Sequence, residues 1–217
     1  MIKLCIFDLD GTVLDSVATI AHYANLALSQ HGIEPIETGR YRYLAGRGIE
    51  RLLRGALAER EREGDEALYK SVYRTYDDAY NANPSHQTRI FDGMKETLDA
   101  LKERGIKLAV VSNKPDFAAK GVINELYGEG YFDFVTGAVD AYPLKPDPKS
   151  TLAVIRRFGV DRGEVLYIGD TATDIETAKN AAITAVGVLW GFREKEELLS
   201  AGAEHIVGSP CELLDLL

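Results

Sequence analysis

Two aspartates, Asp8 and Asp10, follow an apolar run near the start of the chain. The run, Leu4 to Phe7, is continuously apolar and therefore predicts a strand buried on both faces. If the chain stays extended beyond it, the spacing of two puts both carboxylates on the same side. Carboxylates so close repel each other unless a cation lies between them or one is protonated. Either condition is useful for chemistry, and Gly11 allows the sharp turn that follows.

Polar side chains also follow later apolar runs. In an open parallel sheet, ligands bind at the carboxyl ends of the strands, so the residues after each run are the candidates for a site. Besides Asp8 and Asp10, these candidates are Thr12, Ser112, Asn113, Lys114, Asp140, Lys145, Asp170 and Asp174. The set combines carboxylates with hydroxyl, amide and lysine side chains, and it contains no histidine or cysteine.

These side chains indicate phosphoryl transfer assisted by a metal ion. Oxygen ligands of this kind suit Mg²⁺ better than zinc. A carboxylate can act as a nucleophile and form an acyl phosphate. The negative charge of the transferred group can be met by Mg²⁺, Lys145 and Ser112. Asp10 can protonate the leaving oxygen and later take a proton from water.

The composition narrows the class of protein. A length of 217 residues allows one large domain, or a core with a smaller insert, and the apolar share of 46% suffices for a core. A net charge of −9 argues against a nucleic-acid or membrane-surface partner. The sequence has no signal-peptide pattern, no run of ~20 apolar residues and no disulfide framework. These observations predict a cytoplasmic protein. The side chains suited to phosphoryl transfer imply a small phosphorylated substrate, and both a monomer and a homodimer remain open.

The hydrophobic pattern divides the chain into two parts. Residues 15–83 show helical periodicity only, with helices expected over 17–28, 38–44, 49–62 and 65–80 and no strand. Further on, strands expected over 106–111, 132–135, 165–168, 185–189 and 205–207 alternate with helices, one of them opened by a Thr173–Glu176 capping box. We assign 1–14 and 84–217 to an α/β core, a Rossmann-like parallel sheet with helices on both faces, and 15–83 to an inserted all-helical cap domain.

Four segments in this order resemble the motifs of the haloacid-dehalogenase-like hydrolases. They are residues 8–13, 112–114, 145–146 and 169–174, and together they are far more specific than any one alone. The resemblance implies that Asp8 is the nucleophile and Asp10 the general acid and base. It also implies that Mg²⁺ is held by the Asp8 side chain, the Asp10 backbone carbonyl and Asp170.

The resemblance extends to the phosphoryl group and its surroundings. It implies that Ser112 and Lys145 bind this group and that Asp174 supports the metal site or Lys145, and we assign Asn113 to phosphate binding together with Ser112 and Lys145. Without the resemblance, Ser112 and Asn113 could serve only to cap the helix that begins near Pro115, and Lys145 could be an exposed loop lysine. Capping and phosphate binding are compatible, because a helix N-terminus attracts anions.

The second aspartate of the first motif is similar to that of phosphatases and phosphomutases in the family. Residues 11–16, 45–48 and 112–115 are more narrowly similar to phosphoglycolate phosphatases. We therefore expect a Mg²⁺-dependent phosphoric monoester hydrolase, with 2-phosphoglycolate as the first candidate substrate. The alternatives are a phosphomutase of the β-phosphoglucomutase type, a phosphatase for pyrophosphate, nucleotide or sugar phosphate, and a non-catalytic binding protein. Arg47, between two glycines, is either a surface arginine or a contact for a substrate carboxylate.

Overall fold

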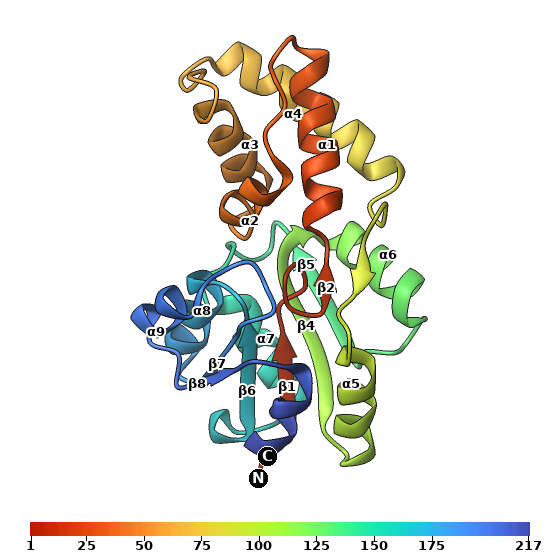
Figure 1. Cartoon of the computed structure of the whole chain (residues 1–217). Helices are drawn as coiled ribbons and strands as arrows, with labels where there is room; N and C mark the ends of the chain where they lie inside the picture. The colour runs from red at the N-terminus through yellow and green to blue at the C-terminus, as the bar shows by residue number, and fades with distance from the viewer. The chain divides into compact units, whose positions relative to one another are not determined.

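A computed structural model describes all 217 residues, and the chain forms two compact units (Figure 1). One unit consists of Met1–Asp15 and Arg89–Leu217, and the other of Ser16–Thr88. The segment 84–88, which the sequence assigned to the core, joins the helical unit. The reason is local, because the Thr19 hydroxyl donates to the His86 carbonyl and lies 2.7 Å from the Thr88 hydroxyl. That the helical unit works as a cap stays a prediction.

The α/β unit is built on a six-stranded sheet in which every neighbouring pair is parallel. In spatial order its strands are β5 (Phe134–Ala138), β4 (Lys107–Pro115), β1 (Leu4–Phe7), β6 (Val165–Gly169), β7 (Thr184–Val188) and β8 (His205–Val207). The strand β1 lies between β4 and β6. The segments that follow these three strands therefore meet at one edge of the sheet.

Helices cover both faces of this sheet, as the sequence predicted. Successive strand residues alternate between two buried clusters, so that Phe7 packs on one face and Ile6 on the other. The first face is covered by α5 (Met94–Glu103) and α6 (Asp116–Tyr127), and the second by α7 (Lys149–Phe158), α8 (Ala172–Ala181) and α9 (Lys195–Ala201). Short 3₁₀ helices complete the unit at Arg162–Glu164 and Pro210–Leu216. This arrangement is the expected Rossmann-like α/β core.

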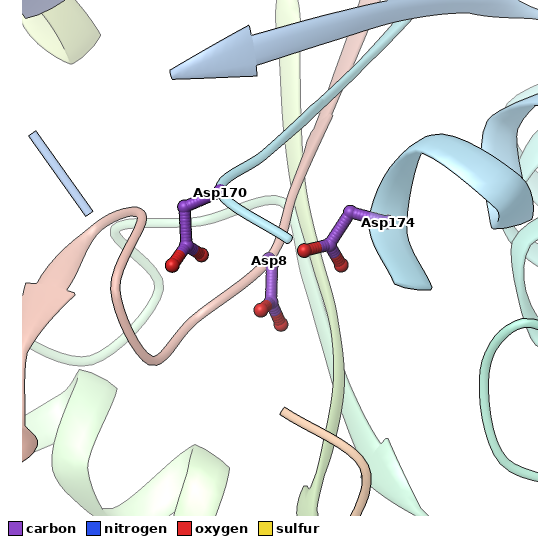
Figure 2. Close-up of side chains that lie close together, drawn as sticks. All are labelled: Asp8, Asp170 and Asp174. Carbon is purple, nitrogen blue, oxygen red and sulfur yellow. The ribbon is translucent and has the colours of Figure 1, made fainter. Parts of the chain in front are cut away.

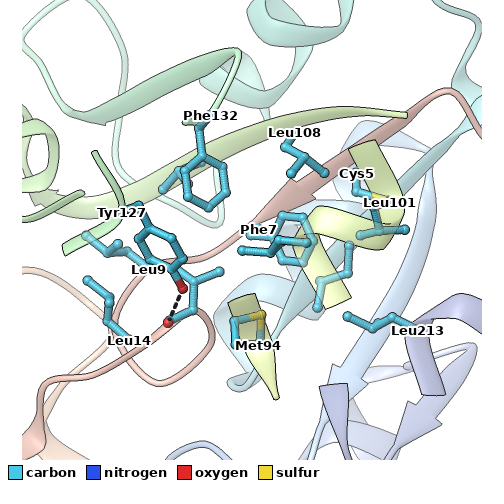
Figure 3. Packing of buried hydrophobic residues seen from close by; sticks show 14 of the residues in the cluster. Cys5, Phe7, Leu9, Leu14, Met94, Leu101, Leu108, Tyr127, Phe132 and Leu213 are labelled. Atoms are coloured by element: carbon cyan, nitrogen blue, oxygen red, sulfur yellow. Dashed lines mark hydrogen bonds between the residues drawn. The ribbon is translucent and has the colours of Figure 1, made fainter. Parts of the chain in front are cut away.

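The first cluster anchors the loop that follows β1 (Figure 3). Phe7 packs edge-on against Phe132, with ring centroids 6.5 Å apart. Tyr127, at the end of α6, donates a hydrogen bond of 2.9 Å from its buried hydroxyl to the Val13 carbonyl. The apolar core and this hydrogen bond together hold the loop that carries the two aspartates.

A two-stranded antiparallel ribbon was not expected from the sequence. It pairs β2 (Leu14–Asp15) with β3 (Arg89–Ile90), the two places where the α/β unit is interrupted. Arg89 Nη2 lies 2.9 Å from Asp15 Oδ2 across the pair. Strands of two residues are too short to show an alternating pattern, which is why sequence reading misses them.

The other unit is entirely helical, in agreement with the sequence. Its elements are α1 (Val17–Gln30), a 3₁₀ turn (Thr38–Arg40), α2 (Tyr41–Leu44), α3 (Ile49–Ala58) and α4 (Glu66–Ala82). Tyr76 and Tyr80 of α4 are buried, and the Tyr80 ring packs edge-on against Tyr23 at 5.5 Å. These two tyrosines of α4 therefore contribute to packing. Neither unit contains a helix that is both long and apolar enough to span a membrane.

Candidate active site

The aspartate loop turns back on itself directly after β1. The Leu9 carbonyl accepts hydrogen bonds from the backbone N–H groups of Val13 and Leu14, at 3.1 and 3.0 Å. Gly11 has a φ of +91°, a conformation that favours glycine. A Cβ atom at Gly11 would also lie 2.2 Å from Asp170 Oδ2. Glycine is thus required here, because the loop approaches Asp170 closely.

Three buried carboxylates meet at this edge of the sheet (Figure 2). Asp8 follows β1, Asp170 follows β6, and Asp174 lies in the first turn of α8. Each offers an oxygen atom within 4.8 Å of the others. Asp8 is 4% exposed, and Asp170 and Asp174 are fully buried. The structure therefore brings together three acids that the sequence singled out.

Lys145 supplies a buried positive charge to this cluster. Its Nζ atom lies 2.7 Å from Asp174 Oδ1, to which it donates a hydrogen bond, and 2.7 Å from Asp8 Oδ1. The second contact is an ion pair, and Asp8 Oδ1 is buried with no hydrogen-bond partner besides this ammonium group. Lys145 is 5% exposed, which excludes the reading of an exposed loop lysine.

Asn113 holds the backbone of Lys145. Its amide oxygen accepts from the Lys145 N–H at 2.8 Å, and its amide nitrogen donates to the Lys145 carbonyl at 3.2 Å. A carboxamide that pairs with one residue's backbone in both directions fixes that segment in place. The side chain thus links the end of β4 to the loop that carries Lys145.

The capping box of α8 differs from the sequence prediction. Thr173 and Glu176 do not form it, because the helix begins at Ala172 with Thr171 as its N-cap. Asp174 Oδ2 accepts from the Thr171 N–H at 3.1 Å and from the Thr171 hydroxyl at 2.7 Å. Since Asp174 Oδ1 accepts from Lys145, both oxygens of Asp174 have donors within the protein.

Asp170 is held from two sides. The Thr12 hydroxyl donates to its Oδ1 at 2.9 Å, and the Phe192 N–H donates to its Oδ2 at 2.8 Å. Trp190 donates from its indole N–H to the Thr12 carbonyl at 2.9 Å, and a Cβ atom at Gly191 would lie 2.3 Å from Asp170 Cβ. The sequence reading missed this Trp190–Phe192 segment, because it acts mainly through its backbone. The sequence feature that could have indicated this segment is the glycine that directly follows the chain's one tryptophan, just beyond the end of a strand.

Asp10 pairs with Lys114, a partner that the sequence did not assign to it. Lys114 Nζ lies 2.8 and 3.1 Å from the two oxygens of Asp10. The Lys114 side chain is 4% exposed and that of Asp10 is 16% exposed. The first and second motifs are therefore joined by a largely buried ion pair.

Ser112 and its neighbours lie in a bulge of β4. Three residues, Ser112 to Lys114, stand opposite the single residue Gly137 of β5. A Cβ atom at Gly137 would lie 2.3 Å from the Lys114 carbonyl oxygen, so glycine is needed for this close approach. Bulges beside active sites turn side chains toward the site. Ser112, 6% exposed, is placed in this way at the carboxyl end of β4, next to the end of β1.

Two other candidates are not members of this cluster. Arg47 is exposed and belongs to the helical unit, where the glycines on either side of it have φ values of +104° and +85°. Its contact with substrate stays a prediction. Asp140 follows β5 and is exposed, so it is not among the buried acids.

The buried charges shift one another's pKa. Burial, and then the charge of Asp174, raises the pKa of Asp8 to about 7. Burial and the charges of Asp174 and Asp8 raise the pKa of Asp170 well above its ordinary value. Burial disfavours the charge of Lys145, but Asp174 and Asp8 outweigh this effect and its pKa is raised. The three buried acids thus outnumber the single buried lysine beside them.

This donor set fits a divalent cation with oxygen ligands. Lys145 is the one cation in contact with Asp8 Oδ1, and three buried carboxylates surround this single positive charge, so a second cation would compensate the excess of acids. Asp170 accepts one hydrogen bond on each oxygen and keeps lone pairs for a metal. Asp174 is engaged on both oxygens, so Asp8 and Asp170 are the better ligands. Oxygen ligands alone favour Mg²⁺ over softer metals.

The chain is similar to known proteins over most of its length. Residues 5–188 match the family described as "Haloacid dehalogenase-like hydrolase". Over 191 residues the chain is 34% identical to the phosphoglycolate phosphatase of Agrobacterium fabrum, covering 88% of this chain and 82% of that protein. Over 215 residues it is 33% identical to that of Aquifex aeolicus, covering 99% and 96%. The crystal structure of a candidate phosphoglycolate phosphatase from Lactobacillus delbrueckii is 31% identical, with a TM-score of 0.92 and coverage of 99% and 97%.

Proposed function

The chain belongs to the haloacid dehalogenase-like hydrolases and is a phosphatase, and we propose that it removes the phosphoryl group from 2-phosphoglycolate or a similar small metabolite. The names of the relatives support this choice of substrate. We propose Mg²⁺ as the metal, since the donor set at Asp8 and Asp170 consists of oxygen atoms.

The observation that carries the proposal is the state of Asp8. Its carboxylate is buried at the end of β1, and its Oδ1 atom lies 2.7 Å from the Lys145 ammonium group with no other hydrogen-bond partner. Such a carboxylate is available to attack phosphorus, whereas Asp174 is engaged on both oxygens. The attack transfers the phosphoryl group to an Asp8 oxygen and leaves an aspartyl phosphate.

Lys145 and Ser112 are the proposed binding groups for the phosphoryl oxygens. Lys145 contacts Asp8 directly, so its ammonium group can meet the charge that develops beside the nucleophile. Ser112 lies at the end of the adjacent strand and offers a hydroxyl. Asn113, whose amide pairs with the Lys145 backbone, is proposed to act mainly by holding that lysine.

Asp10 is the proposed general acid and base. It would protonate the leaving oxygen in the first step and take a proton from the attacking water in the second. Asp8, Asp170 and the backbone carbonyl of Asp10 would hold Mg²⁺. When bound, the metal would neutralise the charge of the phosphoryl group and of the acids around it.

A phosphate-release assay tests this function. Protein treated with EDTA and then supplied with Mg²⁺ is given 2-phosphoglycolate, pyrophosphate, a nucleoside monophosphate and sugar phosphates. We expect metal-dependent release of inorganic phosphate, fastest from 2-phosphoglycolate. Isomerisation of β-glucose 1-phosphate without phosphate release would instead indicate a phosphomutase. No reaction with any compound would indicate a binding protein on this fold.

A further inference from the structure

We infer that Lys114 binds an anionic group on the leaving part of the substrate, and so selects phosphate monoesters whose alcohol carries a carboxylate. The inference rests on the proposed function and adds to it a residue that determines specificity. Its starting point is the contact of Lys114 with Asp10, at 2.8 and 3.1 Å from the two carboxylate oxygens.

The two lysines of the site contact different acids. Lys145 contacts Asp8 and Asp174, which places it with the nucleophile and the phosphoryl group. Lys114 contacts Asp10, the group proposed to protonate the leaving oxygen. The positive charge of Lys114 therefore belongs to the leaving-group side of the reaction.

Distances put a substituent of the leaving group within reach of Lys114. A general acid lies about 3 Å from the oxygen it protonates. Lys114 Nζ lies 2.8 Å from one oxygen of that acid. The ammonium group is thus within about 6 Å of the ester oxygen in the bound substrate. A carboxylate one carbon beyond that oxygen can reach the ammonium group and form a charge-assisted hydrogen bond.

The bulge of β4 fixes the position of Lys114. The lysine is the last residue of the three-residue bulge opposite Gly137, and its N–H lies 3.2 Å from the Ser112 hydroxyl, to which it donates. Its side chain is 4% exposed. A buried ion pair contributes little net stability compared with apolar side chains of the same size. Stability alone therefore gives no reason for a lysine at this position, whereas anion recognition does.

The test compares two substrates that differ in this carboxylate, and it uses the ratio between them so that other differences are the same for every variant. In ethyl phosphate, a methyl group replaces the carboxylate of 2-phosphoglycolate. For each protein we would measure kcat/KM with both compounds and take their ratio. The variants are Lys114→Met, Lys114→Gln, which keeps a donor for Asp10 without the charge, and Lys114→Arg. The control is Lys120→Met, which removes an exposed lysine paired with Asp116 on α6.

We expect Lys114→Met and Lys114→Gln to lower the preference for 2-phosphoglycolate at least about 10-fold, the value of one hydrogen bond between charged groups. Lys114→Arg should keep most of the preference, and Lys120→Met should keep all of it. Equal losses on both substrates would mean that Lys114 only positions Asp10, and would overturn the inference. If the wild-type protein releases no phosphate from either compound, the proposed function itself fails.

A binding measurement covers variants that are too slow to assay. In an Asp8→Asn background, which cannot form the aspartyl phosphate, calorimetry gives the affinity for each compound. Adding Lys114→Met should weaken 2-phosphoglycolate at least about 10-fold more than ethyl phosphate. An equal effect on both affinities would overturn the inference, and a far-UV circular dichroism spectrum identifies any variant that has not folded.

Discussion

Asp174 accepts a hydrogen bond of 2.7 Å from Lys145, and both side chains are buried. The other oxygen of Asp174 closes the first turn of α8 through Thr171. One carboxylate thus ties the lysine of the third motif to the helix of the fourth. We propose that Asp174 holds Lys145 beside Asp8, which is one of the two roles that the sequence left open.

Replacing this carboxylate by its amide tests the link. In Asp174→Asn, an NH₂ group replaces one carboxylate oxygen, and this group donates hydrogen bonds but cannot accept them. The side chain can then accept from Lys145 or from Thr171 but not from both. The buried charge of Lys145 therefore loses a partner. We expect a loss of about 3 kcal/mol or more in the free energy of unfolding, and a KM for p-nitrophenyl phosphate raised about 10-fold. Denaturant unfolding and steady-state kinetics measure the two effects.

Asp147→Asn is the matched control. Asp147 also accepts from a backbone N–H in a first helical turn, that of Lys149 at 2.9 Å, but it lies at the surface. We expect a change within about 0.5 kcal/mol. Equal losses in the two variants would refute the special status of Asp174.

The acid cluster predicts how stability depends on pH without metal. The pKa of Asp8 is raised from 3.8 to about 7, and that of Asp170 is raised as well. Between the ordinary pKa of Asp8, 3.8, and its raised pKa of about 7, the folded protein binds more protons than the unfolded chain. The free energy of unfolding therefore falls as the pH rises from about 4 to about 7. Surface acids with lowered pKa, such as Glu164, lose their contribution only below about pH 4.5.

Melting temperatures from pH 5 to pH 8, with EDTA or with Mg²⁺, check this dependence. Because a cation favours the ionised acids, Mg²⁺ should stabilise the protein more at pH 8 than at pH 5. Asp8→Asn should flatten the dependence without metal. If the melting temperature without metal rose steadily from pH 5 to pH 8, it would contradict the raised pKa values of the acid cluster.

Gly191 is expected to control metal affinity through Asp170. A Cβ atom there would lie 2.3 Å from Asp170 Cβ and 2.4 Å from the Gly11 carbonyl oxygen, so the backbone must shift in Gly191→Ala. We expect Mg²⁺ to bind at least about 10-fold more weakly, because a ligand's supporting contacts commonly contribute this much to metal affinity. Calorimetry measures the affinity, and the fluorescence of Trp190, the one tryptophan, reports on the same segment.

Gly121→Ala provides the comparison for this variant. Gly121 lies within α6, and nothing stands within 4 Å of its would-be Cβ atom. That variant should bind Mg²⁺ like the wild type and gain up to about 1 kcal/mol from helix propensity. Unchanged affinity in Gly191→Ala would mean that this segment does not position Asp170.

The parts of the fold that the sequence could predict are those with a strong pattern. The continuous apolar run before Asp8 predicts β1 with its observed bounds, and the alternation of strands and helices predicts the parallel sheet. Polar residues after such strands must meet at one edge, which is why Asp8, Asp170 and Lys145 could be assigned together.

The missed features depend on contacts between distant segments. The pairing of Lys114 with Asp10 depends on a bulge whose size is visible only from the register of β4 against β5. The Trp190–Phe192 segment acts on Asp170 mainly through the backbone, which leaves little trace in residue type.

The capping box of α8 lies two residues before the predicted position for a local reason. Thr171 and Thr173 are equally good caps by sequence, and only the start of α8 distinguishes them.

The covalent phosphorylation of Asp8 is the central claim, and trapping the intermediate tests it most directly. In Asp10→Asn, which lacks the base that activates water, p-nitrophenyl phosphate should still phosphorylate Asp8, since its leaving group needs no proton. Acid quenching and mass spectrometry of the peptide that contains Asp8 should then find one added phosphoryl group. Release of inorganic phosphate by this variant with no phosphoryl group on that peptide at any time would contradict the account.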